Sequence, residues 1–317
     1  MGVTGSIGVG ADSASGGTAV SITLGAAVAT NTAKATTAAL VDAGADLCAG
    51  TRGPGSCAPI GQVIITATQT GAVEAVIVAV TLGVAVGKGV TVSIAAAVGT
   101  NTLTNTVTAT VTGVGTLVRA GTVTIGAAAN NSITATTVAV SIGVTVNSGS
   151  GLTATVTIGA AVSLNAIADT ITAGVDAATV SAGNGGVSVS ASTGGATRTI
   201  TTTAVAASLT ASVAGSVTSA NIGVSLAAAV STATLSSTVH ADITGGATIS
   251  SAAGVTVQAS SAGSITAKVG AGTLTATIDG SPTVAIAIAA AVAVDTVNDD
   301  VRALVSTRRR RSSPPGR

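Results

Sequence analysis

The sequence predicts an all-β protein, a repeat β-solenoid (β-helix) of about four and a half units of 60–70 residues. Three observations predict this fold class. Apolar residues alternate with small polar residues, the alternating phrase returns along the chain, and the 317 residues include 41 Gly but no Phe, Tyr or Trp. A period of two indicates strands with one buried face, and a recurring phrase indicates a repeat architecture. Without aromatic side chains to fill it, the core must be thin.

The clearest copy of the phrase is VTVSIAAAVGTNTLTNTVTATV at residues 90–111. Its larger apolar residues fall on even positions before Asn101 and on odd positions after it. This change of parity predicts a bulge or corner at Asn101 that keeps the apolar side chains on one buried face. Asn and Asp suit such a corner because they tolerate positive φ. The structural corner residues predicted in this way are Asn31, Asn101, Asn165 and Asp295, and Ala233 takes their place in a further copy.

The phrase recurs at a nearly constant interval. The intervals are 70, 64, 68 and 62 residues, counted along Leu24, Ile94, Ile158, Leu226 and Ile288. A second segment of the form V-x-V-x-A or V-x-I-x-A recurs at intervals of 60, 64 and 68 residues. We therefore expect residues 1–305 to form a single repeat array without an internal domain boundary.

The width of one coil follows from how the units stack. If one unit makes one wide coil, equivalent residues lie about 4.8 Å apart along the axis, and Asn31, Asn101 and Asn165 form a ladder of hydrogen-bonded amides. A weaker similarity within each unit, offset by about 30 residues, would suit two narrower coils and would place the same residues about 9.6 Å apart. Two narrower coils would require a second change of parity in each unit, as regular as the one at Asn101. The second change is less regular, which favours the single wide coil.

Composition excludes several classes of protein. Charged residues are 7% of the chain, the net charge is +1 and the mean hydropathy is +0.73. No apolar run reaches the roughly 18 residues that a membrane-spanning helix needs. An outer-membrane β-barrel stays open as an alternative, although such barrels carry aromatic girdles. Nothing in the charge balance attracts nucleic acid.

The two cysteines, Cys48 and Cys57, lie nine residues apart in the segment LCAGTRGPGSCAP. Its Gly, Pro and Ser residues predict an exposed loop inserted between two units. We expect a disulfide, with free thiols as the alternative, because a metal site would need further ligands nearby. A disulfide favours an oxidising compartment, and we expect an extracellular or cell-surface location.

No catalytic, cofactor-binding or metal site is predicted. His240 occupies an outward-facing position of the predicted alternation and has no evident partner residues nearby in the sequence, which predicts a surface side chain. The acidic cluster Asp295, Asn298, Asp299 and Asp300 raises a calcium hypothesis, because oxygen ligands suit that ion. The equivalent residues of an earlier copy are Asn and Thr, which favours a polar turn instead. The protein is therefore not expected to be an enzyme.

The two ends of the chain differ from the array. Residues 306–317 form a basic tail with consecutive arginines at Arg308–Arg311, and we predict that this tail is disordered. The first twenty residues lack the basic and apolar regions of a secretory signal. Because the period has already begun there, we expect the sequence to be a piece of a longer array or one whose targeting signal has been lost. A true cytoplasmic start is the alternative, which the composition disfavours.

The repeated phrase, seen as VSIAAAVGTNTLTNTVTA and AIAIAAAVAVDTVNDDVRA and followed after a gap by a V-x-V-x-A segment, resembles the β-helical repeats of very large bacterial exoproteins. These include filamentous-haemagglutinin-like adhesins and leukotoxin-type surface proteins, and the resemblance covers nearly all of residues 3–305. It implies a secreted or cell-surface rod that serves as a stalk or passenger. The few charges on the chain would do little to stop self-association through sheet edges or faces. A host or surface ligand is the other partner we expect.

Two other functions are weighed against this one. A flat, Thr-rich solenoid face can bind ice, and Thr134–Thr137 and Thr199–Thr203 supply threonines, but without a regular T-x-T ladder at a fixed coil spacing. A polysaccharide lyase on a β-helix would need clustered acidic, basic or aromatic side chains, and the sequence does not supply these clusters.

Overall fold

The computed structural model describes residues 2–11, 18–53, 56–147, 149–194, 198–215, 219–278 and 282–306. Every regular element in these ranges is a β-strand, and most strand pairs are parallel. No helix able to cross a membrane occurs in this part of the chain. The predicted all-β fold is therefore confirmed, and stacked parallel sheets are the arrangement expected of a β-solenoid. The predicted tail, from 307 onwards, lies outside the described residues.

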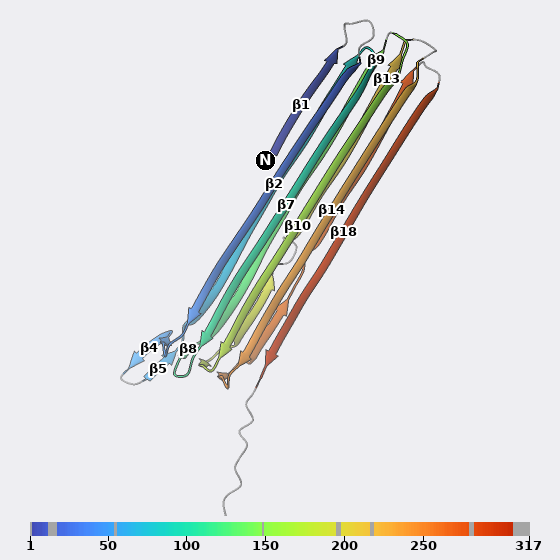
Figure 1. Ribbon diagram of the computed structural model, residues 1–317. Coiled ribbons are helices and arrows are strands. Elements are labelled where there is room, and N and C mark those ends of the chain that lie inside the picture. Colours follow the sequence, from blue (N-terminus) through green and yellow to red (C-terminus); the bar gives the residue numbers. More distant parts are fainter. Residues whose placement is uncertain are drawn as a thin grey trace, which may run out of the picture.

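One long sheet contains five parallel strands of 23 or 24 residues, and we call it the five-stranded sheet. Its strands run side by side, long and straight, along the whole body of the molecule (Figure 1). In spatial order they are β18 (Thr283–Val305), β14 (Asn221–Thr244), β10 (Thr153–Asp176), β7 (Gly89–Thr112) and β2 (Ala19–Val41).

A seven-stranded sheet packs against it, and a short four-stranded sheet joins the two at one end. The seven-stranded sheet contains β1 (Gly2–Ala11), β6 (Gln62–Val86), β9 (Thr122–Asn147), β12 (Val187–Thr193), β13 (Thr199–Ala214), β16 (Val255–Ser260) and β17 (Ser264–Ile278). The four-stranded sheet contains β3 (Asp46–Cys48), β8 (Leu117–Ala120), β11 (Thr179–Ala182) and β15 (Thr248–Ser251). A separate antiparallel hairpin is formed by β4 (Gly50–Gly53) and β5 (Ser56–Pro59).

Neighbouring strands of the five-stranded sheet are one sequence repeat apart and in register. Asn101 pairs with Asn31 on one side, 70 residues earlier, and with Asn165 on the other, 64 residues later. The Nδ2 of Asn31 donates to the Oδ1 of Asn101 at 2.8 Å, and the Nδ2 of Asn101 donates to the Oδ1 of Asn165 at 2.7 Å. The predicted amide ladder and the single wide turn per unit are therefore confirmed.

The predicted corner at these residues is wrong. Asn101 lies in the middle of β7, whose burial alternates without a break from Gly89 to Thr112. Among the described residues only Ala43 and Ala177 have positive φ without being glycine. The strand does not bend to bring the larger residues back inside, so those before Asn101 face outwards and small residues face the interior. Asn31, Asn165 and Asp295 likewise lie inside the uninterrupted strands β2, β10 and β18.

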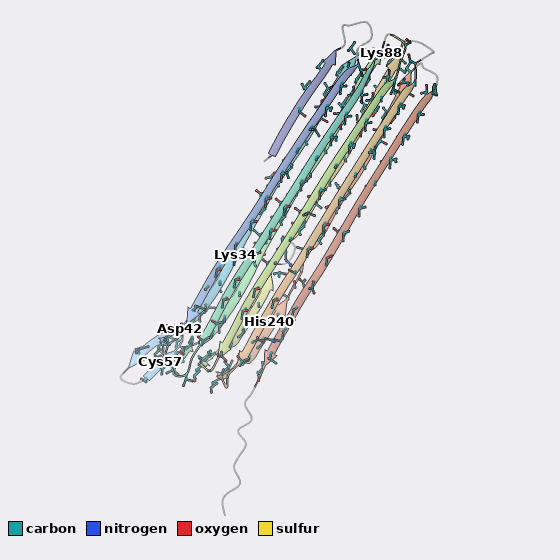
Figure 2. All side chains as sticks on the ribbon, viewed as in Figure 1. Lys34, Asp42, Cys57, Lys88 and His240 are labelled. Carbon is teal, nitrogen blue, oxygen red and sulfur yellow. A yellow bond between two sulfur atoms is a disulfide. The ribbon has the colours of Figure 1, made fainter. Side chains whose placement is uncertain are left out.

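The ladder residues divide the body into two halves. We call the part from this level to the end near Lys88 the distal half, and the part that reaches Cys57 and Asp42 the proximal half (Figure 2). The proximal core consists of Val, Ile and Ala side chains such as Ile125 and Ile171, both fully buried. The distal core is almost entirely Ala, and the polar residues that share it are mostly Ser and Thr, with Asn147 and Asn221 at its end.

The two long sheets approach each other closely in the distal half. A Cβ built on Gly159 would lie 2.6 Å from the backbone oxygen of Ala207 on the facing sheet, and one on Gly143 would lie 2.6 Å from the Cγ2 of Thr157. These contacts are shorter than van der Waals separation, so only glycine fits at these positions. The small interior residues therefore permit a spacing that Val or Ile would prevent.

Hydroxyl groups hydrogen-bond one another across this narrow interior. The Oγ1 of Thr145 donates to Thr91 at 2.7 Å and lies 2.6 Å from the Oγ1 of Thr155. The Oγ of Ser225 donates at 2.8 Å to the backbone oxygen of Ser208. Buried hydroxyls are costly without partners, and here several of them supply partners to one another.

Candidate functional site

A belt of buried polar side chains crosses the interior where the two halves meet, and it contains an ion pair in which both side chains are fully buried. Its first component is the amide ladder, in which Asn101 is fully buried and Asn165 is 3% exposed. The ladder ends at Asn165 because Ala233 occupies the next position. The Nδ2 of Asn165 donates instead to the Oγ of Ser163 at 3.0 Å.

The second component is an ion pair without solvent contact. The Nε of Arg198, which directly precedes β13, lies 3.4 Å from the Oδ2 of Asp169 on β10, and both side chains are fully buried. Asn131 donates to the Oδ1 of Asp169 at 2.7 Å, and Asn105 donates to the same oxygen at 3.1 Å. Burial raises the pKa of Asp169, although these amides and the charge of Arg198 oppose the effect.

Arg198 also connects β10 to the last strand of the sheet. Its Nη1 donates to the Oδ1 of Asp299 at 3.2 Å, and its Nη2 donates to the backbone oxygen of Ser236 at 2.6 Å. Ser237 and Ser261 donate to Asp299 at 2.6 and 2.8 Å. Partial burial acts to raise the pKa of Asp299, but these hydroxyls and Arg198 outweigh it, and the pKa lies below the usual value.

The acidic cluster on β18 does not form one site. Strand alternation places Asp299 on the inner face beside Ser237, whereas Asn298 and Asp300 fall on the outer face. The oxygens of Asp299 are already bonded to Arg198, Ser237 and Ser261. Among the described residues, no group of three or more His, Cys, Asp or Glu side chains is arranged to hold a metal ion. The polar turn expected here is also absent, because the cluster lies within a strand.

His240 has charged neighbours that the sequence analysis did not find. It faces outwards on β14, as expected, with its Nε2 3.2 Å from the Oδ2 of Asp300 and its Nδ1 3.3 Å from Arg302. Arg302 also donates to the Oδ2 of Asp242 at 2.6 Å, and this hydrogen bond raises the pKa of Arg302. The register brings together residues about 60 positions apart, so no local motif announces the contact.

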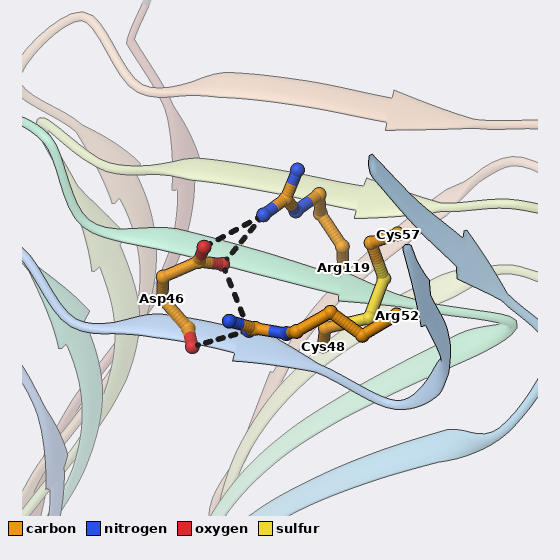
Figure 3. Close-up of a disulfide and its surroundings, with 5 residues drawn as sticks. All are labelled: Asp46, Cys48, Arg52, Cys57 and Arg119. Atoms are coloured by element: carbon orange, nitrogen blue, oxygen red, sulfur yellow. Dashed lines mark hydrogen bonds and ion pairs between the residues drawn. A yellow bond between two sulfur atoms is a disulfide. The ribbon is translucent and has the colours of Figure 1, made fainter. Parts of the chain in front are cut away.

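The predicted disulfide is present at the proximal end. Cys48 and Cys57 are bonded, with their Cα atoms 6.0 Å apart. Beside them the carboxylate of Asp46 lies between two arginines (Figure 3). Arg119 donates to both oxygens of Asp46 at 2.7 Å, and Arg52 lies 3.7 Å from Oδ1. The hydrogen bond from Arg119 lowers the pKa of Asp46. The disulfide therefore fixes the β4–β5 hairpin next to a charged cluster.

The outer faces of the two halves differ as much as the interiors. In the proximal half, the outward positions of β7 from Thr100 to Thr112 are all threonine. Further threonines lie beside them on neighbouring strands, and we call this surface the threonine face. In the distal half the outward positions of the same strands are Val, Ile, Leu and Ala. Thr134 and Thr136, which the sequence analysis singled out, pair with Thr201 and Thr203 on the seven-stranded sheet.

Two surface depressions lie on these outer faces. One, of about 210 Å³, is lined by Thr104, Thr170, Thr238 and Asp300 among others on the proximal part of the five-stranded sheet. The other, of about 360 Å³, lies on the distal part of the seven-stranded sheet and is lined mainly by Val140, Ile142, Leu209 and Leu274. The first is polar and the second apolar, in keeping with the half to which each belongs.

Comparison with protein-family models, with curated proteins and with solved structures finds no match to this chain.

Proposed function

We propose that the chain is a structural repeat segment, a stalk or passenger, of a secreted or cell-surface, adhesin-like bacterial exoprotein. In finer detail, it is a β-solenoid of about four and a half units and acts without catalysis. The observation that carries the proposal is the register: five strands stack in register over more than twenty residues each. Such stacking builds a stiff body whose length grows with the number of units.

Two further features support this role. The disulfide between Cys48 and Cys57 suits an oxidising compartment. The ion pair of Asp169 and Arg198 is used inside the body, where it links three strands or strand ends rather than facing a ligand. The polar belt thus holds these strands in register.

Location in the producing cell tests the proposal. Antibodies against the chain should detect it in the culture medium or on intact cells, and protease added outside should remove it. Thiol titration of this exported material should find Cys48 and Cys57 unreactive until a reductant is added. Material confined to the cytosol, or exported material with two free thiols, would contradict the proposal.

The threonine face favours a second candidate, ice binding. Its hydroxyls repeat about every 6.6 Å along β7, and neighbouring strands are about 4.8 Å apart. A flat lattice of hydroxyls can hold ordered water. Among the strands of this sheet, the full T-x-T alternation runs along β7 alone. Across the neighbouring strands, Thr36, Thr106, Thr170 and Thr238 form one row of hydroxyls.

Ice recrystallisation separates the two candidates. If the face binds ice, the chain should slow crystal growth, and Thr106→Val should weaken the effect because it removes a central hydroxyl while keeping the shape. Thr124→Val, an outward residue of β9 on the other sheet, is the matched control and should have no effect. A wild-type chain without influence on crystal growth would exclude this candidate.

A further inference from the structure

The outer face of the five-stranded sheet carries a continuous apolar surface in the distal half. Five outward positions on each strand contain only Val, Ile, Leu or Ala, and we call this surface the apolar band. Its members are the even-numbered residues of 20–28, 90–98, 154–162, 222–230 and 284–292. On β2, at one edge of the sheet, Val20, Ile22 and Leu24 are 56, 63 and 65% exposed.

The band is large enough to form a stable interface. Nine residues of strand span about 26 Å and five strands span about 24 Å, which gives roughly 600 Å² before the relief of the side chains is counted. The largest apolar patch on a typical monomer measures about 300–600 Å², and a specific interface buries at least about 1,000 Å² in total, or about 500 Å² on each partner. The band therefore has the area that a specific protein contact needs.

The band contains no charged residue. The nearest charged residues on the same face lie beyond its two ends. On the proximal side the nearest outward charge is Lys34, six residues beyond Val28 along β2. On the distal side Lys88 lies in the turn that precedes β7. A partner that covers the band therefore desolvates no charged group.

We propose that a second copy of this chain covers the apolar band, face to face and with its strands antiparallel. Lipid is the less suitable occupant, because the sheet is open at β2 and β18 and would expose unpaired backbone groups to hydrocarbon. A second copy leaves both edges in water. This contact does not depend on where the protein is located or on whether it is a stalk.

The relief of the band is complementary to itself. The row of Ala26, Ala96, Ala160, Ala228 and Ala290 forms a shallow groove across the sheet. Beside it the row of Leu24, Ile94, Ile158, Leu226 and Ile288 forms a ridge. A two-fold axis that runs between these rows places the ridge of each copy in the groove of the other, as an isologous interface requires. Interdigitated apolar rows of this kind form dry sheet-to-sheet contacts.

This arrangement also explains why only half of the face is apolar. In the antiparallel pair the distal halves overlap, and the proximal halves point in opposite directions. Lys34, His240 and the threonine face then remain in water. The apolar depression at Ile142 and Leu274 on the seven-stranded sheet stays on the outside of the pair.

The mass of the full chain in solution tests the proposal. Light scattering during size-exclusion chromatography should give about twice the chain mass of 29.2 kDa, or more if pairs associate further. Ile158→Lys places a charge at the centre of the band on the outward side of β10. It should raise the dissociation constant at least ~30-fold, as expected at the centre of an interface.

Thr170→Lys is the matched control, because it adds the same charge to the outward side of the same strand in the proximal half. It should leave the mass unchanged, and both variants should keep the strand signal of the wild type in circular dichroism. A wild-type chain that runs as a monomer overturns the proposal, and if that monomer floats with phosphatidylcholine vesicles, lipid is the occupant instead. An assembly that Ile158→Lys does not weaken, or that Thr170→Lys weakens equally, also overturns it.

Discussion

The proximal and distal halves are built from the same strands but bury opposite kinds of side chain. Along β7 the residues that face the interior change from Val107 and Leu103 in the proximal half to Ala97, Ser93 and Thr91 in the distal half. The outward residues change in the opposite sense, from threonine to Val and Ile. The proximal half stabilises itself by apolar burial, whereas the distal half relies on close approach of the sheets and on hydrogen bonds between hydroxyls.

The difference shows that alternation and burial are separate properties. A strand that alternates with a period of two has two faces, and the pattern alone does not say which of them is covered. In the distal half the covered face is the one that carries the smaller side chains, because Gly and Ala let the two sheets approach each other closely. The face that carries the larger side chains lies on the outside.

The polar belt between the halves should respond most strongly to substitution. Arg198→Met leaves the carboxylates of Asp169 and Asp299 without their cation, and Asp169 is fully buried. We expect a loss of about 3–5 kcal/mol in the free energy of unfolding. Urea denaturation measures it, with Arg119→Met at the exposed pair with Asp46 as the control. An equal loss in the two variants would show that burial of the pair is unimportant.

The proximal core should depend on large side chains where the distal half does not. Ile125→Ala removes a fully buried side chain and should lower the free energy of unfolding by about 2–5 kcal/mol. Ile94→Ala trims a residue of similar size on the outer face of β7 and should cost less than about 1 kcal/mol. Urea denaturation at low protein concentration compares the two. A larger loss for Ile94→Ala would mean that its row is buried.

The distal core should depend on small side chains. Gly159→Ala places a Cβ 2.6 Å from the backbone oxygen of Ala207 and should cost about 1–3 kcal/mol, because the sheets must move apart. Gly126→Ala, on an outward position of β9, meets nothing closer than 3.4 Å and should be nearly neutral. Thermal unfolding of both variants checks the prediction. A neutral Gly159→Ala would contradict the close approach of the sheets.

The pH dependence of stability should give the smallest effect. Because burial raises the pKa of Asp169, the folded state holds this proton more tightly than the unfolded state does. The contribution of Asp169 to stability is therefore full below its ordinary pKa of 3.8 and is lost as pH rises through the folded value. Asp299 acts in the opposite sense, because its pKa is lowered.

Urea denaturation of the wild type and of Asp169→Asn across the acidic range isolates the first contribution. The stability of the wild type relative to this variant should fall as pH rises. A difference that is constant with pH, or that grows, would show that burial does not raise the pKa of Asp169 in the folded state.

Much of the fold follows from the sequence, because register depends on spacing. The intervals of 70 and 64 residues between Asn31, Asn101 and Asn165 predict that these residues are equivalent, and a single wide coil per unit then places their amides in a ladder. The disulfide of Cys48 and Cys57 also follows, because its loop is short and rich in turn residues. In each case the spacing along the sequence identifies the partner: one repeat unit for the asparagines and nine residues for the cysteines.

The choice of the buried face could not be read from the larger residues. The change of parity at Asn101 suggested a corner, but the inward residues before it, from Gly89 to Gly99, are uniformly small. That uniformity was the signal for a close approach of the sheets. Arg198 could not be found, because its partners Asp169 and Asp299 stand on other strands, 29 and 101 residues away in sequence.

The length of the in-register strands has a mechanical consequence. The hydrogen bonds between β10 and β14 connect the strands sideways over all 24 paired residues. A force applied along the strands shears this entire ladder at once, so the load is shared among its rungs. A force that pulls the first and last coils apart instead peels one strand from an edge and breaks the rungs in succession. The body should therefore resist tension strongly along its strands and weakly along its stack.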